Sequence, residues 1–152
     1  MPSQKILIPV ATEDDDGAEL GARAAIVALR LAEPDDELLL LSVLPPALRG
    51  AGCHDDESVQ RNSSGVLAAA HQLDEIAASL TGRGRAVTTH VSRASSAAEE
   101  IIRASAEAAF VVMPSHSRRG LGRLVYGSVA QQVAHEAEIP VHIICGADRQ
   151  RP

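Results

Sequence analysis

The residues best suited to chemistry lie close together between residues 114 and 128, in a polar stretch rich in serine, arginine and glycine. Glycines allow backbone amides to approach an anion closely, and a helix that begins after the last glycine adds the positive end of its dipole. Arginine side chains can neutralise phosphate, although they can also simply solvate a surface loop. The combination predicts a cationic, partly glycine-rich anion site formed by Ser115, Arg118, Gly120, Arg123, Gly127 and Ser128.

Two other residues of this stretch allow more than one interpretation. A histidine side chain ordinarily titrates near neutral pH, so His116 could act as an acid or a base. No Ser-His-Asp or Cys-His arrangement accompanies it in the sequence, so an exposed loop histidine is the simpler interpretation. Ser128 and Gln131 have the spacing of a capping box, in which the serine hydroxyl caps the helix. A cap and a phosphate contact are compatible roles for Ser128.

Two clusters elsewhere contain metal-ligating residue types. The acidic run at residues 13–16 (EDDD) could attract a divalent cation, but consecutive carboxylates cannot all converge on one ion. We interpret it as charge that favours a helix N-terminus, and expect a metal there only together with a nucleotide. Residues 53–56 (CHDD) lack a second pair at zinc spacing, so we expect a mobile loop with a free thiol. Cys145 is interpreted as a small core or interface residue, and His142 lies in the same expected strand.

Composition argues against several classes of partner. The chain has 152 residues, of which 45% are hydrophobic but only 1% aromatic, so its core must consist of aliphatic side chains. The net charge of −6 gives no basic field for nucleic acid or anionic lipid, and aromatic platforms for base stacking are scarce. No apolar run is as long as a membrane span, and no secretory signal or CxxC pattern is present. We therefore expect no nucleic-acid or membrane partner, and a cytoplasmic location.

Four short apolar runs and one alternating segment lie between amphipathic stretches of the chain. The runs predict strands at residues 5–10, 37–44, 110–113 and 141–145, and the alternating segment predicts one at 86–91. Helical spacing predicts helices at 17–33, 65–80 and 128–138, and a capping box at Ser96 and Glu99 begins another that continues to about residue 107. Residues 47–64 and 114–127 are interpreted as loops. The order predicts a single doubly wound α/β domain, with a mainly parallel five-stranded sheet and about four helices on its two faces.

The long loop after the fourth strand is also where the chain resembles a known family. From Arg118 the sequence follows the pattern R-x-G-L-G-R-L-x-x-G-S-V-A-x-x-V-x-x-x-A-x-x-P-V-x-I-I. Together with ILIPV, LLLLSV, AAEEII and FVVM in earlier segments, this pattern resembles the universal stress protein family along nearly the whole chain. The resemblance implies a Rossmann-like sheet of order 3-2-1-4-5, related to that of the adenine nucleotide alpha hydrolases, and a stress-associated regulatory function. It also implies a family domain at residues 1–147 with a short tail at 148–152, and a homodimer joined through Val141–Cys145.

The nucleotide-binding branch of that family holds ATP phosphates on a loop of pattern G-x-x-G-(nine residues)-G-[Ser/Thr]. Here the first two glycine positions hold Pro114 and Ser117, and only Gly127-Ser128 matches. Proline has no amide to donate and cannot adopt positive φ. Relatives that bind nucleotide usually have an aspartate after the first strand, where this chain has Ala11. The resemblance therefore implies an impaired site for ATP or another adenine nucleotide, with Mg²⁺, formed by Pro9, Val10, Ala11, Met113, Ser115, His116, Ser117, Arg118, Gly120, Arg123, Gly127, Ser128 and Val129.

Three functions are left open by these residues. The first is a stress-response regulatory protein whose altered loop still holds an adenine nucleotide. The second is a dimeric interaction protein of the same fold that binds no nucleotide, with protein partners that the residues do not identify. The third is a slow nucleotide hydrolase, which needs a water-positioning group and a metal site for which the sequence offers no clear candidates. We expect no enzyme activity beyond weak hydrolysis.

Overall fold

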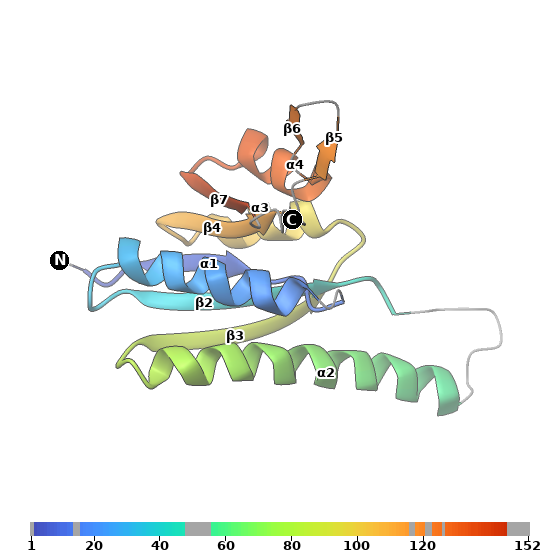
Figure 1. Cartoon of the computed structure of the whole chain (residues 1–152). Helices are drawn as coiled ribbons and strands as arrows, with labels where there is room; N and C mark the ends of the chain where they lie inside the picture. The colour runs from blue at the N-terminus through green and yellow to red at the C-terminus, as the bar shows by residue number, and fades with distance from the viewer. Residues whose placement is uncertain are drawn as a thin grey trace, which may run out of the picture.

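A five-stranded parallel sheet lies at the centre of the molecule (Figure 1). The computed structural model describes residues 2–13, 16–47, 56–115, 118–120, 123–125 and 127–145. The sheet consists of β1 (Lys5–Pro9), β2 (Glu37–Leu44), β3 (Ala86–Arg93), β4 (Phe110–Ser115) and β7 (Val141–Cys145). They pair in the order β3-β2-β1-β4-β7, all in parallel. The predicted order 3-2-1-4-5 is therefore confirmed, β7 being the fifth strand of this sheet.

Helices cover both faces of the sheet and bury a separate aliphatic core on each. Helices α1 (Gly17–Leu31) and α2 (Asp56–Thr81) pack on one face, and α3 (Ala97–Ser105) and α4 (Ser128–Glu136) on the other (Figure 1). Successive strand residues alternate between the two cores, as the pleat requires. In β1, for example, Ile6 and Ile8 face α1 and α2, whereas Leu7 faces α3 and α4. β1 and β2 consist largely of consecutive apolar residues because both of their faces are covered.

Helix α2 is longer than the sequence predicted. We expected a loop up to residue 64, but the helix begins at Asp56 and has 26 residues. Its first turns extend beyond the carboxyl ends of the strands (Figure 1). A helical segment that covers no sheet needs no apolar stripe, so periodicity gives no sign of it. Gly65 lies inside the helix rather than at its start, and a Cβ there would meet nothing within 4 Å. Residues 53–55, the rest of the expected mobile loop, lie outside the described residues.

The segment interpreted as a loop at residues 114–127 contains regular structure. Strand β4 continues through Ser115, so Pro114 is a strand residue in register with Ile144. Two three-residue strands, β5 (Arg118–Gly120) and β6 (Arg123–Val125), then pair as an antiparallel hairpin. The hairpin stands beside α4, away from the central sheet (Figure 1). The loop interpretation was therefore wrong for much of this segment.

The remaining boundaries of helices and strands differ from the predicted ones by at most two residues. The capping box expected before α3 is present in part, since Ser96 Oγ accepts a hydrogen bond of 3.2 Å from the Glu99 amide. Within the described part of the chain, no helix combines the length and the apolar character needed to cross a membrane.

Candidate functional site

A pocket opens at the carboxyl ends of β1 and β4, the two strands between which the strand order reverses. From β1 the chain moves outward to β2 and β3, and it then returns to add β4 and β7 on the opposite side. In open α/β sheets this reversal leaves a crevice where ligands bind. The cavity has a volume of about 310 Å³, which is within the range of small-molecule sites.

Three helices begin at this pocket. Gly17, Ala97 and Ser128, the first residues of α1, α3 and α4, all line it. The amides in the first turn of a helix have no partner within the helix, and the N-terminal end of the dipole is positive. The mouth of the pocket therefore favours a negatively charged group. Of the described residues that line it, only Glu13 has a charged side chain, and that charge is negative.

The floor of the pocket is apolar. Leu41 and Val43 come from β2, Ile101 from α3 and Met113 from β4. Leu41, Ile101 and Met113 are at most 4% exposed and belong to the core beneath α3 and α4. Such a floor suits the planar, weakly polar face of a heterocyclic base better than a charged group.

Close packing fixes the β1 side of the pocket. A Cβ placed on Gly17 would lie 2.0 Å from the carbonyl oxygen of Ala11, and one on Gly21 would lie 2.6 Å from Val10 Cγ1. Helix α1 therefore begins in direct contact with the residues that follow β1, and only glycine permits the approach at residue 17. This contact holds Ala11 against the helix.

A pair of hydroxyls lies at the same edge. Thr12 Oγ1 is 2.8 Å from Ser42 Oγ, and Ser42 is 1% exposed. The pair links the segment after β1 to β2, next to the backbone hydrogen bond of 2.8 Å from Val10 to Leu41. Sequence reasoning missed both residues. The available signal was a single serine within the otherwise apolar run LLLLSVL of β2.

A second hydroxyl contact fixes the β4 side. Ser115 Oγ, at the end of β4, accepts a hydrogen bond of 3.1 Å from the Gly127 amide. Gly127 is the N-cap of α4, because its carbonyl accepts the hydrogen bond from the Gln131 amide. The capping box predicted at Ser128 and Gln131 is therefore wrong: Ser128 is already the first helical residue, and its side chain is exposed. Gly127 has φ −58°, so this glycine is not required by positive φ.

The structure brings together most of the predicted site residues that it describes. Those that line the pocket are Pro9, Val10, Ala11, Met113, Ser115, Gly127, Ser128 and Val129. The backbone of Arg118, Gly120 and Arg123 belongs to the β5–β6 hairpin, whereas His116 and Ser117 lie outside the described residues. Lining residues that the prediction omitted are Thr12, Glu13, Gly17, Leu20, Leu41, Val43, Ala97, Ile101, Pro114 and Ala130.

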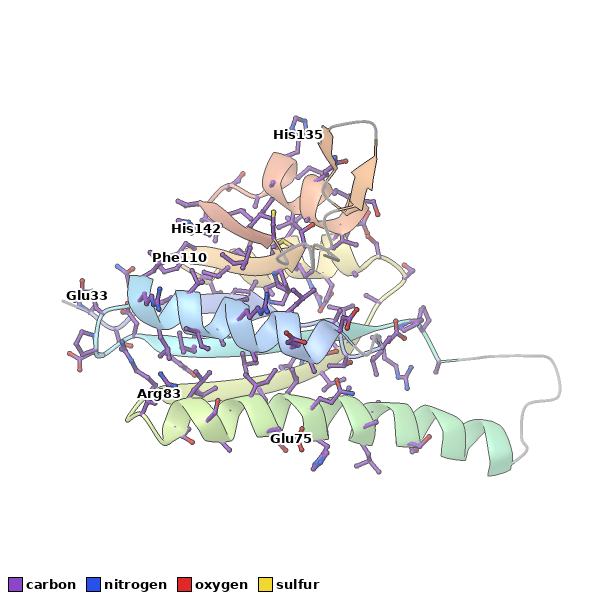
Figure 2. The ribbon with its side chains drawn as sticks, in the orientation of Figure 1. Glu33, Glu75, Arg83, Phe110, His135 and His142 are labelled. Atoms are coloured by element: carbon purple, nitrogen blue, oxygen red, sulfur yellow. The ribbon has the colours of Figure 1, made fainter. Side chains whose placement is uncertain are left out.

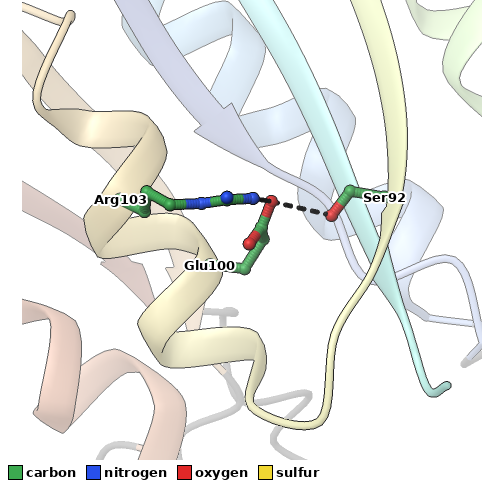
Figure 3. A network of polar contacts seen from close by, with 3 residues as sticks. All are labelled: Ser92, Glu100 and Arg103. Carbon is green, nitrogen blue, oxygen red and sulfur yellow. Dashed lines mark hydrogen bonds and ion pairs between the residues drawn. The ribbon is translucent and has the colours of Figure 1, made fainter.

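A polar network holds α3 against β3 beside the pocket. Glu100 precedes the lining residue Ile101 and accepts hydrogen bonds from Arg103 and, at 3.1 Å, from Ser92 of β3 (Figure 3). The Arg103 hydrogen bond, and secondarily the Ser92 hydroxyl, lower the pKa of Glu100 below its ordinary value of 4.5, although partial burial opposes the shift. Glu100 is therefore a carboxylate at neutral pH, and it orients the helix whose N-terminus faces the pocket.

Two other candidate residues are not among those that line the pocket. His142 is exposed at the start of β7, with its ring edge-on to Phe110 at 5.4 Å, toward the amino ends of the strands (Figure 2). Cys145 is a half-buried free thiol at the end of β7. Among the described residues, no three His, Cys, Asp or Glu side chains come together in a way that could hold a metal ion.

Comparisons with known proteins agree with this architecture. The model of the universal stress protein family matches residues 2–144. A protein of that family from Burkholderia pseudomallei is 26% identical, with a TM-score of 0.61 over 91% of this chain and 94% of the other. The universal stress protein from Archaeoglobus fulgidus, solved in complex with dAMP, is 22% identical, with a TM-score of 0.60 over 95% and 99%. A family protein from Arabidopsis thaliana, solved with AMP bound, is 19% identical, with a TM-score of 0.66 over 99% and 96%. No sequence among the curated proteins searched matches the chain.

Proposed function

The chain belongs to the universal stress protein family, and we propose that it is a stress-response regulatory protein that binds an adenine nucleotide in the pocket between β1 and β4. One observation supports this proposal most directly: a single pocket combines an apolar floor with the first turns of three helices. That combination suits a ligand with a flat, weakly polar ring at one end and an anion at the other.

The α4 end of the pocket is the place for the phosphate. Ser128, Val129 and Ala130 line it and occupy the first turn of α4, where amides have no partner within the helix. The base would then lie on the apolar floor formed by Leu41 and Met113. A Mg²⁺ ion bound with the phosphates would offset the negative charge of the ligand and of nearby carboxylates.

Two relatives of similar fold support the choice of ligand. The Archaeoglobus fulgidus protein was solved with dAMP and the Arabidopsis thaliana protein with AMP, which are both adenine nucleoside monophosphates and differ in the sugar. We therefore take AMP as the first probe.

Replacing Ser128 by proline tests the proposal with little disturbance of the fold. Proline removes the Ser128 amide, and the first helical position tolerates it well. Gly127, with φ −58° and ψ 152°, already has the conformation that a residue before proline prefers. We expect Ser128→Pro to weaken AMP binding by about tenfold or more in calorimetric titration, since a charge-assisted hydrogen bond is lost.

Ser128→Ala is the matched control, because it removes the hydroxyl and keeps the amide. We expect Ser128→Ala to weaken AMP binding by about threefold or less, as for the loss of a single hydroxyl contact. Equal binding by wild type and Ser128→Pro would place the phosphate elsewhere. Absence of AMP binding to the wild-type protein, with and without Mg²⁺, would refute the proposed function.

A second function is favoured by the contacts of Ser115. The Gly127 amide is already satisfied by Ser115 Oγ, and Pro114 has no amide, so two donors of the family's phosphate loop are lost. These features favour a dimeric interaction protein that binds no nucleotide. The variant Pro114→Gly with Ser117→Gly distinguishes the two functions. If it gains nucleotide affinity that the wild type lacks, the native protein is the interaction module.

We also propose a homodimer that pairs through β7. This strand is at the edge of the sheet, and an uncovered edge with apolar side chains favours pairing with another strand. Val141, Ile143, Ile144 and Cys145 are only half-buried in one copy of the chain. Light scattering of the full chain at micromolar concentration should give twice the monomer mass of 15.9 kDa. A monomer would rule this pairing out.

The proposed role is binding rather than turnover, in the cytoplasm. Ser115 is a buried hydroxyl in the pocket, and within the described part of the chain it is hydrogen-bonded to the Gly127 amide rather than to a general base. We expect any hydrolysis of ATP to stay weak. A rate that falls in Ser128→Pro in parallel with affinity would instead indicate a hydrolase.

A further inference from the structure

The Thr12–Ser42 hydroxyl pair lies at the rim of the pocket and has no role in the family pattern described above. Thr12 lines the pocket and is half-buried, whereas Ser42 lies behind it at 1% exposure. Their oxygens are 2.8 Å apart, and either can be the donor. A hydroxyl has one hydrogen to donate and two lone pairs to accept with. Thr12 therefore retains hydrogen-bonding capacity after it has bonded to Ser42.

We infer that Thr12 Oγ1 forms a hydrogen bond to a ribose hydroxyl of the bound nucleotide, and that Ser42 holds Thr12 in position for it. The inference rests on the proposed function, because it requires a nucleotide in this pocket. It makes Thr12 a specificity-determining residue and Ser42 a positioning residue.

The position of the pair relative to α4 indicates which part of the nucleotide it meets. The first turn of α4 lies on the β4 side of the pocket, and Thr12 follows β1 on the side where β1 pairs with β2. With the phosphate at α4 and the base on the apolar floor, the sugar is the polar group left to contact the rim. Ala11, the neighbour of Thr12, has no side-chain group that can form a hydrogen bond.

The chemistry of the pair also suits an alcohol. A carboxylate at this edge could only accept a hydrogen bond, whereas a threonine hydroxyl can donate or accept. It therefore matches a ribose hydroxyl in either orientation. If Thr12 turned away, the buried Ser42 hydroxyl would lose its hydrogen-bond partner, which costs free energy. Ser42 therefore restrains the Thr12 side chain in one orientation.

The test compares AMP, 2′-deoxy-AMP and 3′-deoxy-AMP by calorimetric titration against the wild type, Thr12→Ser and Thr12→Val. Valine keeps the shape of threonine and removes the hydroxyl, and serine keeps the hydroxyl. We expect Thr12→Val to weaken AMP binding by about three- to tenfold and Thr12→Ser to stay within about twofold of the wild type. One deoxy analogue should bind the wild type as weakly as AMP binds Thr12→Val. Thr12→Val should not distinguish that analogue from AMP.

Loss of the Ser42 partner could destabilise Thr12→Val, so the double variant Thr12→Val with Ser42→Ala is measured beside it. The double variant removes both hydroxyls, so it leaves no buried hydroxyl without a partner. Like Thr12→Val, it should bind AMP and that deoxy analogue equally. The inference is overturned if Thr12→Val binds AMP as well as the wild type does, or if it weakens AMP and both analogues by the same factor. If the wild type binds none of the three, the proposed function itself fails.

Discussion

Ser115 Oγ and the Gly127 amide nitrogen lie 3.1 Å apart, and this one hydrogen bond joins the end of β4 to the start of α4. The segment between them, which includes the β5–β6 hairpin, leaves and returns to the same point of the fold. Ser115 is 3% exposed, so the accepting side chain is shielded from water. The contact fixes the N-terminus of α4 at the pocket.

Ser115→Ala should therefore destabilise the fold. The substitution leaves the Gly127 amide without its partner, and we expect the free energy of unfolding to fall by about 1–2 kcal/mol. Urea denaturation followed by circular dichroism measures the change. Ser128→Ala, which removes an exposed hydroxyl from the same corner, should stay within about 0.5 kcal/mol of the wild type. Equal stability of the two variants would mean that the Ser115–Gly127 bond contributes nothing.

Gly127→Ala separates the requirements of the fold from those of a ligand. A Cβ at Gly127 would have its nearest contact, Ser115 Oγ, at an ordinary distance of 3.8 Å. Its φ of −58° is accessible to any residue. We expect a change in unfolding free energy of no more than about 0.5 kcal/mol, but weaker AMP binding, because a methyl group would stand between the backbone and the phosphate. Unchanged affinity would show that the ligand does not approach Gly127.

The strands could be predicted from sequence because most of them are apolar runs between amphipathic helices, whereas their order in the sheet came from the family resemblance alone. The start of α2 could not be predicted from sequence, because the polar turns from Asp56 to Gly65 cover no sheet and have no apolar periodicity. The β5–β6 hairpin has three-residue strands, which are too short for an alternating pattern to stand out.

The site was predictable only where a motif marked it. Residues after β1 and β4 were expected together because these strands are neighbours, and the pocket lies between them. The Thr12–Ser42 pair depends instead on the register of β1 against β2, in which Pro9 lies opposite Leu41. The role of Gly17 depends on a contact with a backbone oxygen. Neither register nor such close approach can be obtained from residue types alone.

Two helical glycines should respond in opposite directions to alanine. Gly17→Ala places a methyl group against the Ala11 carbonyl oxygen, so the start of α1 must shift. We expect the free energy of unfolding to fall by about 1–3 kcal/mol. Gly65→Ala adds a methyl group in open space on α2, and the free energy of unfolding should rise by about 0.5–1 kcal/mol. Both are measured by urea denaturation. A loss of stability in Gly65→Ala would contradict a continuous helix through residue 65.

Glu100 should make stability depend on acid pH. Because the hydrogen bond from Arg103 lowers the pKa of Glu100 in the fold, the carboxylate stabilises the folded state above its ordinary value of 4.5. This stabilisation disappears as pH falls through the lower pKa of the folded state. Its size should be below about 1 kcal/mol, since Arg103 is 77% exposed and solvent screens the pair.

Glu100→Gln removes this titration and keeps the side-chain size. Unfolding free energies of the wild type and the variant should therefore differ more at pH 6 than at pH 3.5. Arg103→Met removes the main cause of the pKa shift. Like Glu100→Gln, it should therefore reduce the change in unfolding free energy between pH 6 and pH 3.5. If the wild type and Glu100→Gln differ by the same amount at both pH values, the network of Ser92, Glu100 and Arg103 acts by packing rather than by charge (Figure 3).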